Sequence, residues 1–192
     1  MRPVWRQLVL VIALALALLQ IHAQTAGIDP ALLARANGGD AAAQVAVGEC
    51  YAAGKGVTKD LTQAAAWYRK AAEKGDLGGE LHLAALYRDG GKGFPRDMAQ
   101  AAAWYRKAAE QGDADAQATL GVLYSFGQGV DRNDGEAYFW LSIAALAKGP
   151  NQDKYAANRQ MVGTHLTVDE VDEIQERVNK WQTAHPQPAA SK

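Results

Sequence analysis

The side chains that hydrolases use as nucleophile and base are few in this sequence and lie far apart. The serines and the histidines after residue 23 are Ser125, Ser142, Ser191, His82, His165 and His185. A serine hydrolase needs a nucleophile, a base and an orienting carboxylate that converge. None of these serines has the Gly-x-Ser-x-Gly surroundings of a nucleophile elbow. We therefore predict no catalytic residues and a protein that is not an enzyme.

Metal-binding patterns are also weak. The histidines show no His-x-x-x-His spacing, and Cys-x-x-Cys cannot occur because Cys50 is the single cysteine. The segment 131–135 resembles the start of a calcium loop, but its glycine, Gly135, comes one place early and the glutamate at the twelfth position is missing. We interpret this segment as a turn followed by a helix cap. We expect neither a metal site nor a cofactor-binding residue, and no cofactor.

Two other features with chemical potential have structural interpretations. The run Gly90-Gly91-Lys92-Gly93 lacks the Ser or Thr that follows the lysine of a phosphate-binding loop, so we interpret it as a turn. Cys50 lies beside Tyr51 on an apolar helix face, and we expect a buried structural thiol rather than a reactive one.

Charge and composition exclude some classes of partner. The chain of 192 residues is 48% hydrophobic and 21% charged, with both signs mixed and a formal net charge of −1. A nucleic-acid or anionic-membrane surface requires a concentrated positive field. We therefore expect no nucleic-acid partner, and the length suits one ordinary domain.

A near-exact repetition organises the chain. The segment QAAAWYRKAAEKG at 63–75 returns as QAAAWYRKAAEQG at 100–112, which places Trp67 and Trp104 37 residues apart, and a weaker copy contains Trp140. A period of this size is typical of helical repeats that bury their apolar faces only against one another. We predict repeats at 40–75, 76–112 and 113–149, preceded by an N-terminal capping helix within 24–39.

Each repeat is predicted to hold two helices. A Gly-Asp junction marks the start of each repeat, because glycine accepts the left-handed backbone that closes one helix and aspartate caps the next. The apolar face of the first helices is Val47, Cys50, Tyr51, Leu83, Leu86, Tyr87, Leu120, Leu123 and Tyr124. A small residue sits beside this face in each copy (Gly48, Ala84, Gly121), as expected where a neighbouring helix approaches closely. Asp60, Asp97 and Asn133 are the predicted caps of the second helices.

The repeat pattern resembles a known family. It reads Gly-x-x-Tyr-x-x-Gly-x-Gly-Val-x-x-Asp, then Ala-x-x-Trp-Tyr-x-x-Ala-Ala-x-x-Gly-Asp, and is similar to the Sel-1-like repeat of the tetratricopeptide-like superfamily. The matching residues of the first repeat are Gly48, Tyr51, Gly54, Gly56, Val57, Asp60, Ala64, Trp67, Tyr68, Ala71, Ala72 and Gly75. The residues that depart from this pattern are Ala84, Gly90 and Phe94 in the second repeat, and Asn133 and Leu141 in the third.

The resemblance implies an all-α fold, a right-handed α-solenoid of helix-turn-helix repeats with terminal capping helices. It also implies a binding scaffold for proteins or peptides. Some Cys-rich secreted relatives have been proposed to act on β-lactams, but this chain lacks their paired cysteines. An envelope hydrolase, or a binder of cell-wall carbohydrate or peptide, stays open as the alternative function.

The two ends carry separate predictions. Residues 1–23 have a basic start, an apolar run of 12 residues at 8–19 and a candidate cleavage site at Ala23, which is typical of a secretory signal peptide. We expect a periplasmic or secreted protein with no stable membrane insertion after cleavage; an uncleaved anchor is the alternative. Residues 150–185 are predicted to form C-terminal capping helices, with Asn151 as the cap of the first and a capping box at Thr167 and Glu170 for the second. The second helix is expected to carry one apolar stripe, made of Val168, Val171, Ile174, Val178 and Trp181. Residues 186–192 are predicted to be a disordered tail.

The inner face of the first helices is the predicted partner-binding surface. Positions there differ between units while core positions hold, and the candidates are Glu49, His82, Asp89, Thr119, Val122 and Phe126. The partner would be a protein or peptide of unknown identity, bound by a monomer. Arg69, Lys70 and Glu73 are predicted to lie on the outer, solvated face.

Overall fold

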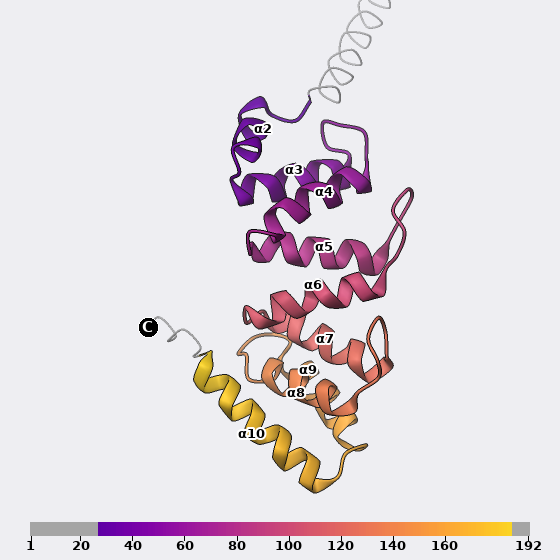
Figure 1. The fold of residues 1–192 in the computed structure, drawn as a ribbon, viewed down its shortest axis with the longest axis vertical. Helices are drawn as coiled ribbons and strands as arrows, with labels where there is room; N and C mark the ends of the chain where they lie inside the picture. Colours follow the sequence, from indigo (N-terminus) through magenta and orange to yellow (C-terminus); the bar gives the residue numbers. More distant parts are fainter. Residues whose placement is uncertain (1–26, 186–192) are drawn as a thin grey trace, which may run out of the picture. The chain divides into compact units, whose positions relative to one another are not determined.

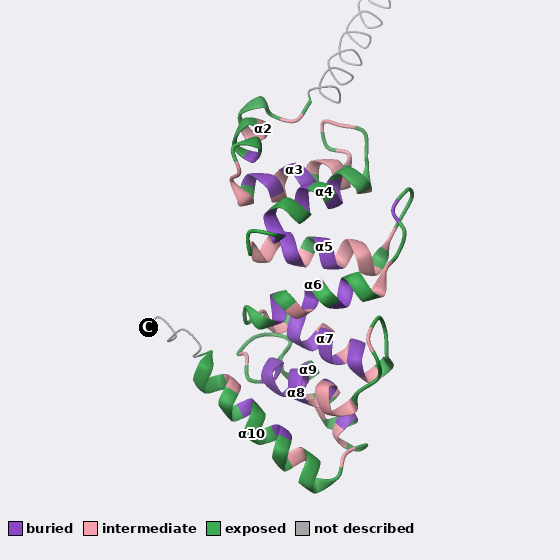
Figure 2. Ribbon diagram, viewed as in Figure 1, coloured by how far each residue is buried: buried purple, intermediate pink, exposed green. Residues whose placement is uncertain are grey.

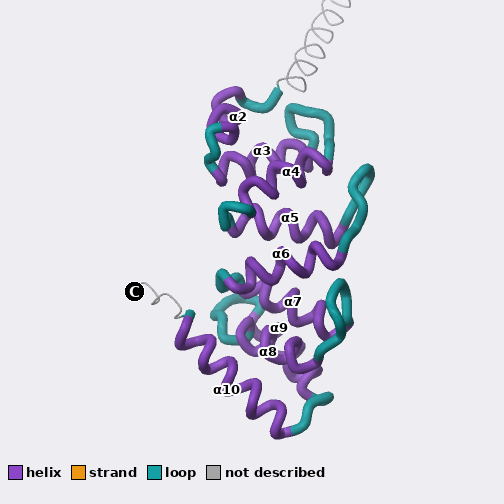
Figure 3. The backbone as a smooth tube through the Cα atoms, in the orientation of Figure 1, coloured by secondary structure: helices purple, strands orange, loops and turns teal. Residues whose placement is uncertain are grey.

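The computed structural model describes residues 27–185, so the predicted signal peptide at 1–23 and the tail at 186–192 lie outside the described residues. Within this range the regular structure consists of nine α-helices and no strand (Figures 1 and 3). They are α2 (Pro30–Asn37), α3 (Ala41–Ala53), α4 (Leu61–Ala72), α5 (Leu77–Asp89), α6 (Met98–Glu110), α7 (Ala114–Phe126), α8 (Asp134–Ala144), α9 (Gln152–Gly163) and α10 (Val168–Ala184). The predicted all-α class is confirmed. None of these helices has the length and hydrophobicity that a bilayer-spanning segment needs.

The helices form two compact units, and the division falls inside α5, after Gly79. The first unit contains α2, α3, α4 and the first residues of α5, together with 92–94. In it α3 packs against both α2 and α4. The second unit contains the rest of α5 and the helices from α6 to α10. In it α7 packs against α6 and α8, and α8 also contacts α9 and α10.

The helix junctions follow the predicted chemistry. Gly39 has a φ of 93°, the left-handed conformation that glycine adopts without strain. The Asp40 carboxylate then accepts a hydrogen bond of 2.9 Å from the amide of Ala43, which caps α3. The same arrangement recurs at 75–76 and 112–113, where the glycines have φ values of 77° and 94°. The predicted caps of the second helices are confirmed as well, at Asp60, Asp97 and Asn133.

Small residues in the first helices let the paired helices approach closely. A Cβ atom on Gly48 would lie 2.5 Å from the Tyr68 ring of α4. A Cβ atom on Gly121 would lie 2.7 Å from Leu141 of α8. Real Cβ contacts are longer than this, so each glycine provides the space that the facing side chain occupies.

The Gly-rich turns pack on the preceding repeat. In the first unit of the structure the Thr62 hydroxyl, at the start of α4, donates to the carbonyl of Gly93 at 3.2 Å. In the second unit Gly129 has a φ of 73° and lies so close to the Met98 carbonyl that a Cβ atom would be 2.1 Å from its oxygen. Both contacts join a turn to the first residues of an earlier second helix.

Burial follows the repeat (Figure 2). Val47, Leu83 and Leu120, which hold the same place in three repeats, are fully buried, and the tryptophans of the second helices are at most 9% exposed. The predicted outer residues Arg69, Lys70 and Glu73 are exposed. One expectation was wrong: Cys50 is half-buried rather than buried, because it flanks the buried line of α3 instead of lying on it.

A buried polar position in the first helices was not predicted. The Gln44 amide donates to the carbonyl of Ala36 at 3.0 Å, and the equivalent Gln117 donates to Ala109 at 3.1 Å. Each carbonyl lies near the end of the preceding helix, where backbone acceptors lack intrahelical partners. In the second repeat this place holds Glu80, whose carboxylate accepts from the Gln111 amide at 2.9 Å.

The C-terminal helices agree with the prediction except at two residues. The capping box at Thr167 and Glu170 is present, and α10 packs on α8 through buried Ile174 and Val178. Val168, predicted to join this apolar stripe, is 76% exposed because it is the first residue of α10, one turn before the contact with α8 begins. Asn151 precedes α9 without a side-chain capping bond: its backbone is helical (φ −97°, ψ 0°) rather than extended as at most N-caps, and its side-chain amide donates to the Asp115 carboxylate at 3.1 Å.

Candidate functional site

One groove of the second unit, of about 400 Å³, lies between α7 and α9, and we call it the α7–α9 groove. Its walls are mainly apolar, and its lining residues are Val122, Ser125, Phe126, Arg132, Asp134, Leu141, Asn158, Met161, Val162 and His165. The groove exists because α9 returns along α7. The Tyr155 hydroxyl of α9 donates to Asp115 near the start of α7, while Met161 and Val162 lie beside the end of α7.

Two large apolar side chains in this groove face solvent. Phe126 is 67% exposed and Met161 is 63% exposed, and both line the same groove. The left-handed glycine that ends α7, Gly127, leaves Phe126 on the last helical turn. An exposed aromatic ring beside a flexible thioether offers an adaptable apolar contact surface.

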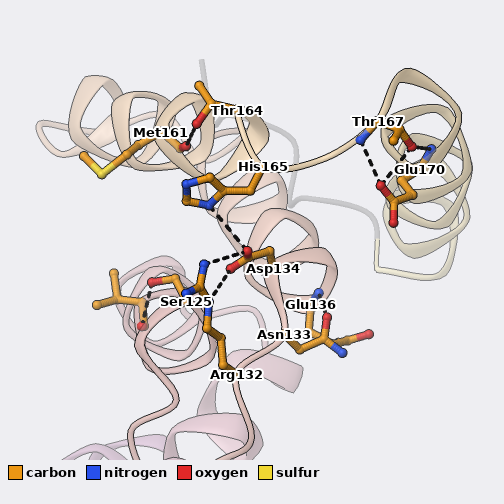
Figure 4. Close-up of polar contacts among 11 residues, drawn as sticks. Ser125, Arg132, Asn133, Asp134, Glu136, Met161, Thr164, His165, Thr167 and Glu170 are labelled. Carbon is orange, nitrogen blue, oxygen red and sulfur yellow. Dashed lines mark hydrogen bonds and ion pairs between the residues drawn. The ribbon is translucent and has the colours of Figure 1, made fainter.

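The polar rim of the groove is a connected set of charges (Figure 4). Asp134, in the first turn of α8, receives hydrogen bonds from Arg132 at 2.9 and 3.3 Å. Its carboxylate also lies 3.4 Å from Nδ1 of His165, which follows α9. The Arg132 guanidinium is the main reason that the pKa of Asp134 lies below its usual range, so this carboxylate is ionised at neutral pH.

Ser125, His165 and Asp134 line one groove and are the three residue types of a hydrolytic triad. A triad requires the serine proton to be directed at the imidazole that the carboxylate orients. The Ser125 hydroxyl instead donates to the Val122 carbonyl at 2.9 Å within α7, and Arg132 holds the carboxylate most closely (Figure 4). This geometry does not form a proton relay. Among residues 27–185, no three or more His, Cys, Asp or Glu side chains gather as metal ligands would.

A second groove, of about 430 Å³, lies on the other side of α7, and we call it the Arg96 groove. Its lining residues are Arg88, Asp89, Arg96, Met98, Thr119, Val122, Leu123 and Gln128. Val122 belongs to both grooves, so α7 forms the ridge between them along the stripe that contains Thr119, Val122 and Phe126. In this stripe Thr119 and Val122 are half-buried and Phe126 is exposed.

The charged residues that line the Arg96 groove differ in whether they already form ion pairs. Arg88 forms a two-point contact with Asp89, at 2.7 and 3.0 Å, and also donates to the Tyr105 hydroxyl at 2.9 Å. These bonds to Arg88 hold the pKa of Asp89 below its usual range. Arg96 is exposed, and the hydrogen bond that its guanidinium makes is to the sulfur of Met98, at 3.2 Å. A thioether is a weak acceptor, so most of the donors of Arg96 face water.

Four of the six predicted partner-binding residues line the two grooves, and two do not. Asp89, Thr119 and Val122 line the Arg96 groove, and Val122 and Phe126 line the α7–α9 groove. His82 is exposed on α5 but lines neither groove, and Glu49 is exposed on α3 in the other unit of the structure. Sequence reasoning missed the groove residues Arg96, Arg132, Asp134, Met161 and His165. Arg96, Arg132 and Asp134 lie in turns or at a helix start of the repeats, where the repeat pattern was interpreted only as structure.

Comparison with known families decides the relationship of the chain. The model of the Sel1 repeat matches residues 41–76, 79–113 and 114–148, more than half of the chain. The chain belongs to the Sel1 repeat family. The predicted resemblance is confirmed, and the helix-turn-helix pairs α3–α4, α5–α6 and α7–α8 are the helices of the three repeats. This Sel1 repeat protein is therefore a repeat scaffold in its architecture.

Two solved structures are similar to this chain. The crystal structure of a Sel1 repeat protein from Oxalobacter formigenes shares 32% sequence identity, with a TM-score of 0.57 over 64% of this chain and 92% of that one. A protective antigen of uropathogenic Escherichia coli strains, which displays an SLR fold, shares 22% identity, with a TM-score of 0.44 over 82% of this chain and 51% of that one. No curated protein matches this Sel1 repeat protein significantly.

Proposed function

We propose that this Sel1 repeat protein is an exported, noncatalytic scaffold that binds a protein or peptide partner in the cell envelope. The partner docks on the stripe of α7 that contains Thr119, Val122 and Phe126, and inserts an apolar side chain into the α7–α9 groove. The observation that carries this proposal is the joint exposure of Phe126 and Met161 in one groove. Binding sites concentrate their energy in a few such apolar anchors beside a polar rim.

Two further facts support a binding role over a catalytic one. The fold is a repeat scaffold, whose side-by-side helices present extended surfaces. The polar groups of the α7–α9 groove are already paired with one another, as Arg132 with Asp134 and Ser125 with the Val122 carbonyl. Paired groups of this kind orient a ligand at a rim and do not supply a free nucleophile.

The envelope location is proposed from residues 1–23. Their two arginines and short apolar run are typical of a secretory signal. A run of 12 residues is shorter than the roughly 20 that a spanning helix requires.

The test is a selection of random peptides displayed on phage against the purified protein, followed by fluorescence anisotropy with the enriched peptides. The double variant Phe126→Ala and Met161→Ala removes both exposed anchors and leaves the buried core unchanged. We expect its affinity to fall by more than about tenfold, since hot-spot truncations cost about 2 kcal/mol or more.

Val168→Ala is the matched control, because Val168 is an apolar side chain even more exposed than Phe126 and Met161 but lies on α10, outside both grooves. This variant should bind as the wild type does. Equal binding by the double variant, or a selection that enriches no peptide, would refute the proposed function.

A further inference from the structure

We infer that the partner segment carries an acidic residue three or four positions from its apolar anchor, and that Arg96 receives this carboxylate. The segment would cross the ridge of α7 in an extended conformation, with one side chain in each groove. This inference rests on the proposed function, because the apolar anchor is the one placed in the α7–α9 groove. It adds the charge and spacing of the partner.

Arg96 is the available charge at this surface. Arg88 and Arg132 each lie within 3 Å of a carboxylate, whereas Arg96 meets no carboxylate within ion-pair distance in the part of the chain that the structure describes. A guanidinium with unused donors binds a carboxylate through two parallel hydrogen bonds. The side-chain amide of Gln128, in the same groove, also makes no hydrogen bond among the described residues and can donate to the same ligand.

The neighbouring charges leave this groove positive. The charged residues that line it are Arg88, Asp89 and Arg96, which gives one net positive charge because Asp89 is ionised. The nearby Asp115 lies one turn before Thr119, and its carboxylate is held by the Tyr155 hydroxyl and the Asn151 amide. The rim of the α7–α9 groove is close to neutral, since Arg132 balances Asp134. Charge complementarity therefore favours an acidic group on the Arg96 side only.

The ridge sets the spacing between the two groups. Thr119, Val122 and Phe126 lie three and four residues apart, so they form one stripe of α7, and Val122 borders both grooves. A helix with its side chains is about 10–12 Å across. An extended peptide advances about 3.3 Å per residue, so three or four residues cross this width.

The experiment uses three labelled peptides that differ at one residue: Gly-Ser-X-Ala-Ala-Phe-Ser-Gly with X as Glu, Gln or Lys. Fluorescence anisotropy at low salt measures their affinity for the full-length protein. We expect the Glu peptide to bind about three- to tenfold more tightly than the Lys peptide, with Gln between them. Higher salt should reduce this difference, because exposed charges are screened.

Arg96→Glu should reverse the order, so that the Lys peptide binds best, and Arg96→Gln should make the three peptides equal. Circular dichroism verifies the fold, and Arg96→Gln remains informative if the charge reversal unfolds the chain. Lys180→Glu, an exposed charge change on α10, is the control and should keep the wild-type order.

The outcomes separate the two proposals. Binding of all three peptides with equal affinity, lost in the Phe126 and Met161 double variant, would overturn the Arg96 assignment and leave the proposed function standing. A Glu preference that survives Arg96→Glu would also overturn the assignment. If none of the three peptides binds, and phage selection also enriches none, both proposals fail.

Discussion

A single hydrogen atom at Gly48 sets how closely α3 and α4 approach. The Tyr68 ring occupies the place where a Cβ atom would lie, at 2.5 Å. We predict that Gly48→Ala lowers the free energy of unfolding by about 1–3 kcal/mol, because overpacking outweighs the gain in helix propensity. The second repeat holds buried Ala84 at this place, so the variant should still fold.

Urea denaturation of the wild type and Gly48→Ala measures this loss. Gly149→Ala is the control, since a Cβ atom there has no neighbour within 4 Å. If Gly48→Ala were as stable as the control, the close contact between α3 and α4 would be wrong.

Tyr68 is also expected to make the free energy of unfolding decrease at alkaline pH. Burial, followed by the charges of Glu49 and Cys50, raises the pKa of Tyr68 to about 12. An unfolded tyrosine titrates near pH 10, so the neutral ring contributes stability that is complete below about pH 10 and is lost as the pH rises through 12. We predict that the wild type loses more stability than Tyr68→Phe between pH 9 and pH 12.

Denaturation curves at several pH values, with absorbance of the tyrosinate near 295 nm, test this expectation. Tyr68→Phe keeps the ring against Gly48 and removes the ionising group. Parallel losses in the two proteins would show that Tyr68 does not contribute to the alkaline transition.

The sequence predicts the roles of residues that act only on neighbouring backbone atoms. Asp40 and Gly39 act through the backbone within three residues, so their roles follow from their types and order. Phe126 was predicted at the binding surface because it differs between repeats. His165 and Met161 could not be placed there, since their position depends on α9 returning along α7, and the repeat period ends before α9. Gln44 was missed because its partner, the Ala36 carbonyl, lies in the preceding helix.

At the scale of elements, each second helix depends on its tryptophan. Trp104 of α6 is 9% exposed, and the ammonium of Lys107 lies 4.1 Å from the ring centroid. The first repeat shows the same pair at Trp67 and Lys70, at 3.8 Å. We predict that Trp104→Ala costs about 3–5 kcal/mol, as expected for removing a buried aromatic side chain.

Lys107→Ala separates packing from the cation–π contact. It leaves the ring buried and should cost at most about 1 kcal/mol. Thermal melts of both variants give the comparison. A Trp104→Ala protein that melts within a few degrees of the wild type would contradict the position of this residue in the core.

At the scale of the whole molecule, the cellular compartment determines which partners the chain can meet. We predict that the protein in its host begins near Gln24 and fractionates with soluble envelope material. N-terminal sequencing and cell fractionation measure this outcome. A protein that retains Met1 and sediments with membranes would support the uncleaved anchor, and a cytosolic protein would refute export.

The Gly-Asp junction has a consequence for how such a chain changes length over evolution. At 75–76 and 112–113 the same dipeptide closes one helix and opens the next. A gene duplication that inserts a copy of residues 76–112 after Gly75 would therefore find a matching junction at each end. Both grooves beside α7 are built from residues after Asp76. The chain can grow in whole repeats on the N-terminal side while the residues of the proposed binding surface stay unchanged. The length of the array and the recognition of a partner can then evolve separately.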